Sequence, residues 1–316
     1  MYKITFYLLF VFGLSLAVSP ADYAGTESMT FLLHNQVEPR IAALGGVVCG
    51  WGKTPSAVLV NPASIASNSI EGVSLSYGNY WEFFNAFSAV VSKRVSDASK
   101  RFVVAGLDGI SYGEFDRMDE NGNKIGTFSA GDFGIFAGYA QRISKVVSAG
   151  VSTRLLFSSL DTFSASAFVL GAGVYARFRR KKSEVGVSIR NIGIPLSKYC
   201  EDELSINPLI SIGGSTRLTG FSGSVGGQVN ISKSRGIKVG SVGLEPAIGF
   251  EFEPAKYFKV RFGYKLRPAP EDANIITNGL SFGIGVTAKK FSFDYALGFY
   301  GDLGVVNIFS LKYWGI

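Results

Sequence analysis

The chain has 316 residues, of which 47% are hydrophobic, 14% are aromatic and only 17% are charged, with a net charge of +7. Soluble domains usually carry about 25% charged residues and about 7% glycine, whereas this chain has 39 glycines, so its composition fits a soluble protein poorly. The length allows one or two ordinary domains and decides nothing further.

The first element is an apolar run from Ile4 to Val18, preceded by a lysine. A transmembrane helix needs about 20 apolar residues, and this shorter run is followed by Ala21 and Ala24, small residues that suit a cleavage site. We predict that residues 1–24 are a cleaved signal peptide; a retained anchor helix is the alternative. No later segment is apolar and long enough to be a transmembrane helix, so a membrane-embedded form of this chain has to be a closed barrel.

Residues 25–70 lack strand periodicity and contain several glycines and prolines, which suit a compact, irregular insert. The stretch is apolar and poor in charge, unlike disordered segments. A barrel of about fourteen strands is too wide for its own side chains to fill, so it is either plugged or conducts. We predict that residues 25–70 are an N-terminal plug; a flexible periplasmic tail is the alternative.

The remainder, residues 71–316, shows period-two alternation. Near the C-terminus Phe291 and Phe293 alternate with Ser292 and Asp294. This period predicts strands with two chemically different faces. It does not by itself separate a soluble sandwich, with the apolar face inward, from a barrel in lipid, with the apolar face outward.

The lengths of the connections favour the barrel. About fourteen strands fit between Glu71 and Trp314, and short connections alternate with longer ones. Outer-membrane barrels have this alternation, with short periplasmic turns and longer external loops. We therefore predict an all-β fold: an antiparallel outer-membrane β-barrel of about 14 strands in a Gram-negative bacterium, its first strand running outward. The longer loops are expected at 114–131, 192–207, 232–240 and 267–277.

The same alternation sorts the charges, with basic turns at the periplasmic rim and acidic external loops. The densest basic turn contains Arg179, Arg180, Lys181 and Lys182. One hypothesis is that this rim docks an acidic periplasmic partner or anionic lipid headgroups. The alternative is that the charged turn simply stays in water. Outer-membrane lipid is an expected partner, and no nucleic-acid partner is expected.

An enzyme is not expected, and neither is a cofactor or a metal site. A serine, histidine and acid triad on the barrel wall would need a histidine on a strand. The single histidine, His34, lies outside the strands. Cys49 and Cys200 are far apart in sequence and too few for a zinc cluster. They either form a disulfide in an oxidising compartment or remain free thiols.

Two short motifs resemble those of a known family. The chain contains Ala43, Leu44, Gly45 and Gly46, followed by Asn61, Pro62 and Ala63. Together with residues 112–115 and 126–132, these resemble the PorV/PorQ proteins of type IX secretion, and PorQ more than PorV. That family is similar to FadL-type barrels, which also carry an Asn-Pro-Ala motif. The resemblance covers roughly residues 31–200.

The resemblance implies a PorQ-like accessory component of type IX protein secretion that contacts secretion-system proteins and turns over no substrate. The alternative is a FadL-like channel for hydrophobic small molecules. Inward strand positions are mainly Ser, Gly and Thr, with Arg154, Arg190 and Arg261 among them. Such a polar lumen favours the secretion interpretation, whereas an apolar pocket near the plug would favour the channel.

Overall fold

The structure is a computed structural model. The predicted signal peptide and Cys200 lie outside the residues that it describes. The described residues are 30–35, 37–81, 83–96, 100–197, 206–233, 237–239, 242–267 and 278–315.

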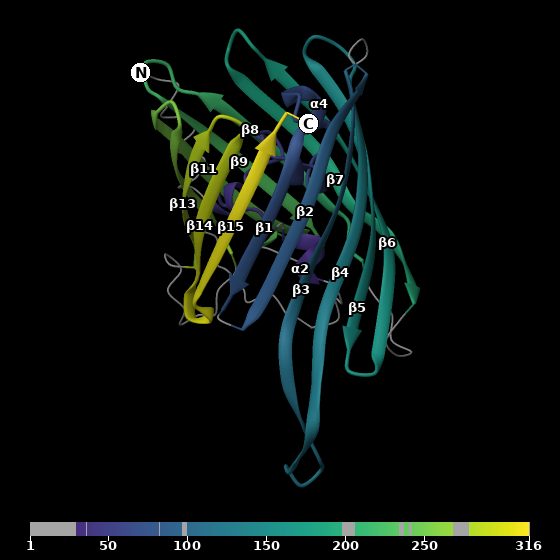
Figure 1. Cartoon of the computed structure of the whole chain (residues 1–316). Helices are drawn as coiled ribbons and strands as arrows, with labels where there is room; N and C mark the ends of the chain where they lie inside the picture. The colour runs from purple at the N-terminus through teal and green to yellow at the C-terminus, as the bar shows by residue number, and fades with distance from the viewer. Residues whose placement is uncertain are drawn as a thin grey trace.

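Within these residues, fourteen antiparallel strands form a closed barrel (Figure 1). Each strand pairs with its neighbours in chain order, β9 pairs with β11, and β15 pairs with β1 to close the ring. A further short strand, β10, pairs with β11. The predicted all-β barrel is therefore confirmed. The strands are β1 (Gly72–Tyr80), β2 (Phe84–Ser96), β3 (Arg101–Met118), β4 (Lys124–Arg142), β5 (Val147–Leu160), β6 (Phe163–Phe178), β7 (Ser183–Ser197), β8 (Leu209–Arg217), β9 (Gly223–Ser232), β10 (Ile237–Val239), β11 (Val242–Ala255), β12 (Phe258–Lys265), β13 (Asn278–Ala288), β14 (Phe291–Tyr300) and β15 (Val305–Trp314).

The two faces of the wall are the reverse of those in a soluble protein. On β14 the outward Phe291 and Phe293 are 52% and 47% exposed, whereas the inward Ser292 and Asp294 are buried. The outward face is apolar because it meets lipid chains, while polar side chains point into the lumen. This arrangement excludes the soluble sandwich.

The two ends of the barrel differ in their connections. At the end that holds the C-terminus every connection is short, as between β11 and β12 (residues 256–257) and between β13 and β14 (residues 289–290). The other end has both short turns, such as residues 161–162 between β5 and β6, and long connections, such as the eleven residues between Ser197 of β7 and Leu209 of β8. Short turns mark the periplasmic end of an outer-membrane barrel. The first strand, β1, starts at this end and runs outward, as predicted.

One expected external loop is different. Residues 114–131 are mostly strand, because β3 continues to Met118 and β4 begins at Lys124. Neighbouring strands stop earlier, so the outer part of this pair is a two-stranded ribbon that projects beyond the barrel (Figure 1). The stacked rings of Phe115 and Phe128, 5.4 Å apart, support it as a cross-strand pair.

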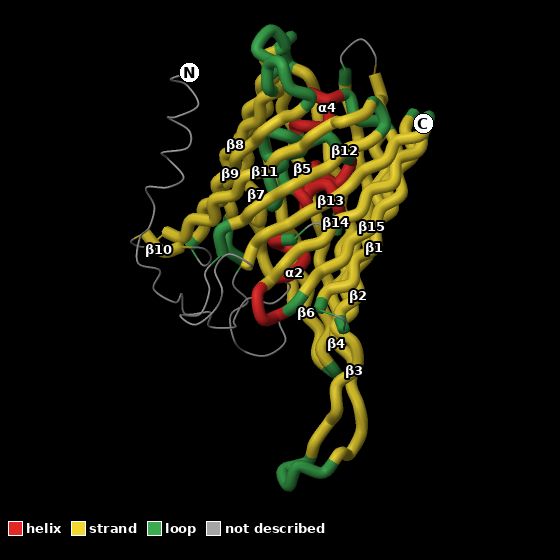
Figure 2. Tube along the Cα trace, turned by 90° about the vertical axis from the view of Figure 1, so that its left-hand side faces the viewer, coloured by secondary structure: helices red, strands yellow, loops and turns green. Residues whose placement is uncertain are grey.

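The chain before β1 forms short helices inside the barrel: α2 (Thr30–His34), α3 (Pro39–Ala43), the 3-10 helix η1 (Pro55–Leu59) and α4 (Ala63–Asn68) (Figure 2). We call the described residues from 30 to 70 the inner segment. It runs from α2, near the external end, to α4, near the periplasmic end. No helix among the described residues is long and apolar enough to cross a bilayer.

Candidate functional site: the inner segment and the lumen wall

The Ala-Leu-Gly-Gly motif ends helix α3. Gly45 and Gly46 have φ angles of +65° and +85°. The Gly46 N–H donates to the Ile41 carbonyl (2.9 Å), and the Gly45 N–H donates to the Ala42 carbonyl (3.0 Å). This pair of bonds is a Schellman helix stop, which favours glycine at the left-handed positions. The motif therefore turns the chain sharply where it meets the wall.

The Asn-Pro-Ala motif ties the inner segment to the wall. The fully buried Asn61 donates through Nδ2 to the carbonyls of Cys49 (3.0 Å) and Val174 (3.2 Å). Its Oδ1 accepts from the Ala63 N–H (3.2 Å) at the start of α4. One side chain thus joins a loop of the inner segment, the first turn of α4 and strand β6.

Glycines on the wall make this contact close. A Cβ added to Gly150 would lie 2.7 Å from the Ala63 nitrogen, and one added to Gly173 would collide with Asn61. Glycine inside a strand commonly marks such a close backbone approach. We call the inward glycines whose missing side chains make room for the inner segment the glycine cradle: Gly138, Gly150, Gly173, Gly186, Gly226, Gly249, Gly263 and Gly283.

A buried ion network holds α3 against strands β11 to β15. Lys312 contacts Asp294 (2.9 Å) and Glu38, and Arg261 contacts Asp294 (2.5 Å). Arg261 also contacts Glu251, at 2.8 Å. The six members alternate in sign and are neutral in sum, because three are cations and three are anions: Glu38, Lys312, Asp294, Arg261, Glu251 and Arg40.

The network begins and ends on the inner segment. Glu38 caps α3 by accepting from the Ile41 N–H (2.8 Å), and Arg40 pairs with Glu251 (3.3 Å) and donates to the Trp51 carbonyl (3.0 Å). Each of the six network residues is at most 4% exposed. Buried charges persist only when they are paired and hydrogen-bonded, so the network holds the inner segment only while all of its pairs are intact.

A second anchor holds α2. Arg154 on β5 pairs with Asp108 on β3 and donates to the Leu32 carbonyl of α2 (2.5 Å). Asn191 on β7 donates to the Leu33 carbonyl (3.2 Å). Like Arg261, Arg154 and Arg190 are buried at the lumen positions that their sequence alternation predicts.

A third anchor lies at the periplasmic end. Arg142, the last residue of β4, donates to the carbonyls of Ala66 (2.8 Å) and Ser67 (2.9 Å) at the C-terminal end of α4. Arg177 on β6 donates to the Ser67 carbonyl as well (3.4 Å). Cations at a helix C-terminus satisfy its unpaired carbonyls and its negative dipole end.

Part of the external half of the lumen is apolar, which the expectation of mainly small, polar inward faces did not include. Leu32 and Leu33 of α2 pack there against apolar wall residues such as Ile110, Leu156 and Val169. We call this cluster the external apolar compartment. The expectation was incomplete because it averaged over whole strands. Polar inward residues also lie in the external half, among them Asp132, Asn230 and Glu245.

Aromatic rings line the external side of this compartment. The Phe31 ring lies edge-on to Tyr80, with centroids 4.8 Å apart, and Trp81 lies edge-on to Tyr300 at 5.4 Å. Edge-to-face pairs at such distances are favourable and offer an apolar surface with polar tips. The compartment therefore has an aromatic mouth.

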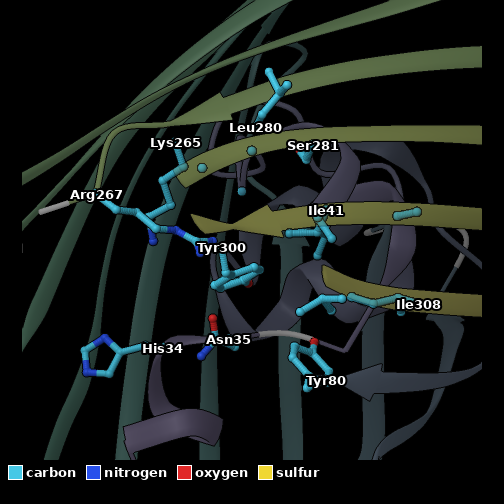
Figure 3. Close-up of a pocket in the computed structure, with 17 residues that line it drawn as sticks. His34, Asn35, Ile41, Tyr80, Lys265, Arg267, Leu280, Ser281, Tyr300 and Ile308 are labelled. Carbon is cyan, nitrogen blue, oxygen red and sulfur yellow. The ribbon is translucent and has the colours of Figure 1, made fainter. Parts of the chain in front are cut away.

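A small pocket opens beside α2, between the inner segment and strands β12 to β15 (Figure 3). Arg267 reaches over the Tyr300 ring at 3.7 Å, and Lys265 pairs with Glu245 at 3.0 Å. His34 lies across the pocket from Arg267 (Figure 3). Its volume is about 70 Å³, enough for water but below the roughly 150 Å³ of an engineered cavity that binds benzene.

A second apolar cluster lies nearer the periplasmic end of the lumen, where α4 packs against the wall. Ile65 of α4 belongs to one buried cluster with inward residues of β2, β3 and β4, among them Val90, Val104 and Phe136. The ion pair of Arg154 with Asp108 lies between the two apolar clusters. Two apolar clusters therefore lie on either side of this ion pair, beside polar inward residues such as Ser92 and Asp132.

The four basic rim residues lie together in the turn between β6 and β7. Arg179, Arg180, Lys181 and Lys182 are all exposed, and none of them pairs with a described carboxylate. The nearby Glu184 is engaged by Arg177 (3.0 Å) and Tyr175 (2.6 Å). The turn therefore presents uncompensated positive charge to its surroundings.

Cys49 is a free, buried thiol. Burial raises its pKa, although hydrogen bonds with Ser188 and Asn61 oppose that rise. In the described part of the chain, no group of His, Cys, Asp and Glu side chains could hold a metal ion.

Sequence reasoning missed most of the ion network. It placed Arg261 in the lumen and Asp294 on the polar face of its strand, but it singled out neither Lys312, nor Glu38, nor Arg40. The available signal was a charged residue at an inward position of an alternating strand, as with Asp294 between Phe293 and Tyr295.

No protein-family model and no curated protein matches the chain. Solved structures do match. The toluene transporter TbuX of Ralstonia pickettii gives a TM-score of 0.58 at 12% identity, over 88% of this chain and 98% of that one. The toluene transporter TodX of Pseudomonas putida gives 0.57 at 12% identity, over 86% and 95%.

A FadL homologue from Pseudomonas aeruginosa gives a TM-score of 0.55 at 10% identity, over 88% of this chain and 98% of that one. These neighbours are FadL-family outer-membrane barrels, and at such low identity the likeness is one of fold. None of the comparisons supports the PorV/PorQ resemblance in particular.

Proposed function

We propose that this protein is an outer-membrane channel for small hydrophobic molecules, with the inner segment as its plug. The observation that carries the proposal is the external apolar compartment with its aromatic mouth. Leu32 and Leu33 fill this compartment. An apolar molecule gains free energy by leaving water for such a surface, so it can compete with these two side chains for it.

The path that the geometry supports follows β2 to β5. It starts at Trp81 and Tyr80, passes the compartment around Leu32, and reaches the second apolar cluster at α4. The pair of Arg154 with Asp108 is the polar barrier between the two, and Arg154 also holds the Leu32 carbonyl. Movement of α2 away from Arg154 is the step that opens the path.

The fold likeness supports this function over the secretion role that the sequence motifs imply. TbuX and TodX carry the name of toluene transporters, so toluene is a suitable first probe. Neither of the two is an enzyme by its name, which agrees with a protein that turns over no substrate.

Uptake of labelled toluene by Gram-negative cells with an intact lipopolysaccharide layer tests the proposal. We expect faster uptake in cells that make the protein, and a further increase with R154L/D108L, because a buried ion pair replaced by apolar side chains removes the barrier at little cost in stability. The matched control is R117L/D161L, which replaces an ion pair outside the lumen. Uptake equal to that of cells without the protein would overturn the channel.

Binding can be measured separately. The chain has three tryptophans, so W51F/W314F leaves Trp81 as the single reporter at the aromatic mouth. Saturable quenching of its fluorescence by a brominated aromatic hydrocarbon is the expected result. Linear quenching without saturation would mean that the mouth holds no site.

The second candidate is a PorQ-like accessory role in type IX secretion, through contacts with secretion-system proteins. The projecting ribbon of β3 and β4 favours it, because the part of β3 after Ser111 and the part of β4 before Ser129 pair only with each other. Such edges are ready templates for pairing with another chain. Deletion of residues 114–129 separates the two candidates: lost recovery of partner proteins with unchanged toluene uptake supports secretion, and the reverse result supports the channel.

A further inference from the structure

The outer wall is not uniformly convex. Across β4 to β8 it is hollowed by a shallow, open groove of about 650 Å³. Its lining is almost wholly apolar and includes Tyr139, Ile143, Val151, Val187 and Ile210. Most of these side chains are exposed on the lipid-facing side.

Small residues form the floor of the groove. Ala172 lies in one cross-strand row with Val151 and Ile189, and Ala149 lies in the next row beside Val174. Larger side chains occupy the same rows on either side, so the surface sinks between them. By contrast, the outward positions of β14 carry large aromatic rings.

The groove lies at the depth of one leaflet. Ala149 is two residues from the start of β5, and Val187 is four residues from the start of β7. Ala172, on the floor, is six residues from the end of β6, or about 20 Å along the strand at about 3.3 Å per residue. Because barrel strands tilt by about 40°, this corresponds to a height of about 15 Å above the periplasmic rim. Half of a bilayer's hydrocarbon core is also about 15 Å thick, so the groove faces the acyl chains of the periplasmic leaflet.

The basic turn from Arg179 to Lys182 stands at the periplasmic end of the same wall, between β6 and β7. Its four cations have no described carboxylate partner. Cations at this height meet lipid phosphates, and each one strengthens attraction to an anionic surface by about fivefold at low ionic strength.

We propose that the groove and the basic turn together bind one anionic phospholipid of the periplasmic leaflet. Its acyl chains lie over Ala149 and Ala172, and its phosphate meets the turn at Arg179 and Arg180. The charge of the turn selects an anionic headgroup over a zwitterionic one, and the hollow wall selects a lipid with chains over a free phosphate.

The proposed lipid site lies on the outer side of the wall that the inner segment contacts from inside. Gly150 and Gly173, which pair with each other across β5 and β6, have their inner sides against Ala63 and Asn61. Only the backbone of the wall separates the groove from the Asn-Pro-Ala motif. A seated lipid therefore stiffens the part of the wall on which α4 rests.

The test uses the purified full-length barrel and native mass spectrometry with phosphatidylglycerol or phosphatidylethanolamine. We expect one phosphatidylglycerol to bind more tightly than the others and more tightly than phosphatidylethanolamine. R179Q/R180Q should weaken that binding by about 25-fold, because two attractions of about fivefold each are lost. A149L/A172L, which fills the groove, should also remove the tight site.

Two matched variants make the result specific. K289Q/K290Q removes the same charge from the turn between β13 and β14, and A105L enlarges an exposed alanine on β3, away from the groove. Both should leave the tight site intact. Equal weakening by K289Q/K290Q, equal binding of the two lipids, or equal binding of glycerol phosphate without chains would each overturn the proposal. So would an acidic protein recovered through Arg179 and Arg180 while lipid binding is unchanged.

Discussion

Replacement of Lys312 by methionine should destabilise the barrel strongly. The Lys312 ammonium is 2% exposed and is shared by Glu38 and Asp294. In the variant, Asp294 keeps Arg261, but Glu38 keeps only its bond from the α3 backbone. Removal of one partner from a buried ion pair costs about 3–5 kcal/mol, and we expect the free energy of unfolding to fall by that amount.

The second substitution E38Q tests whether charge balance is the cause. In K312M/E38Q the network retains two cations and two anions, so part of the loss should be recovered, with a coupling energy of about 1–3 kcal/mol. Urea-induced unfolding in lipid vesicles, followed by tryptophan fluorescence, measures both variants. K290M, an exposed lysine at the same end, is the control and should change stability by less than about 0.5 kcal/mol. A loss below about 1 kcal/mol for K312M, or no recovery in the double variant, would refute the reasoning.

Three further outcomes follow from the same contacts. G173V should push Asn61 from its seat and expose the inner segment to trypsin, whereas G126V, whose Cβ meets open space, should not. N61A leaves two buried carbonyls without their donor, so its free energy of unfolding in urea should fall by about 2–4 kcal/mol. Wild-type stability in N61D would contradict this account, because a carboxylate cannot donate a hydrogen bond. In a C200S background, Cys49 should react with maleimide far more slowly in the folded barrel than in urea at pH 8, because its raised pKa leaves less thiolate. The reaction rates of the folded and the urea-unfolded protein should converge as the pH rises only if the folded thiol is accessible to maleimide.

The barrel could be predicted from the sequence because each strand repeats the same two-residue pattern. Phe291 and Phe293 point outward and Ser292 inward without reference to any other strand. The projecting ribbon was missed because charged residues such as Asp116 and Lys124 interrupt the alternation in water, where neither face needs to be apolar.

The contacts inside the lumen could not be predicted in this way. The pairing of Glu38 with Lys312 joins residues at opposite ends of the chain, and only the closed ring brings them together. The motif residues Gly45, Gly46 and Asn61 were recognised as a pattern, but their work as a helix stop and as a tie to β6 depends on bonds to atoms that the sequence does not place. The plug role and the rim docking remain predictions for the experiments above.

The pairing of Glu38 with Lys312 also constrains how the protein is assembled. Lys312 can pair with Asp294 on the neighbouring β14, but Glu38, which is made early, meets its cation only when β15, made last, is in the wall beside the inner segment. The seam between the first and last strands and the seating of the inner segment are therefore one event. A chain that lacks β15 loses both the β15–β1 seam and the seating of the inner segment. Such a truncated product can neither close the barrel nor hold the inner segment in the lumen, and it is exposed to periplasmic proteases.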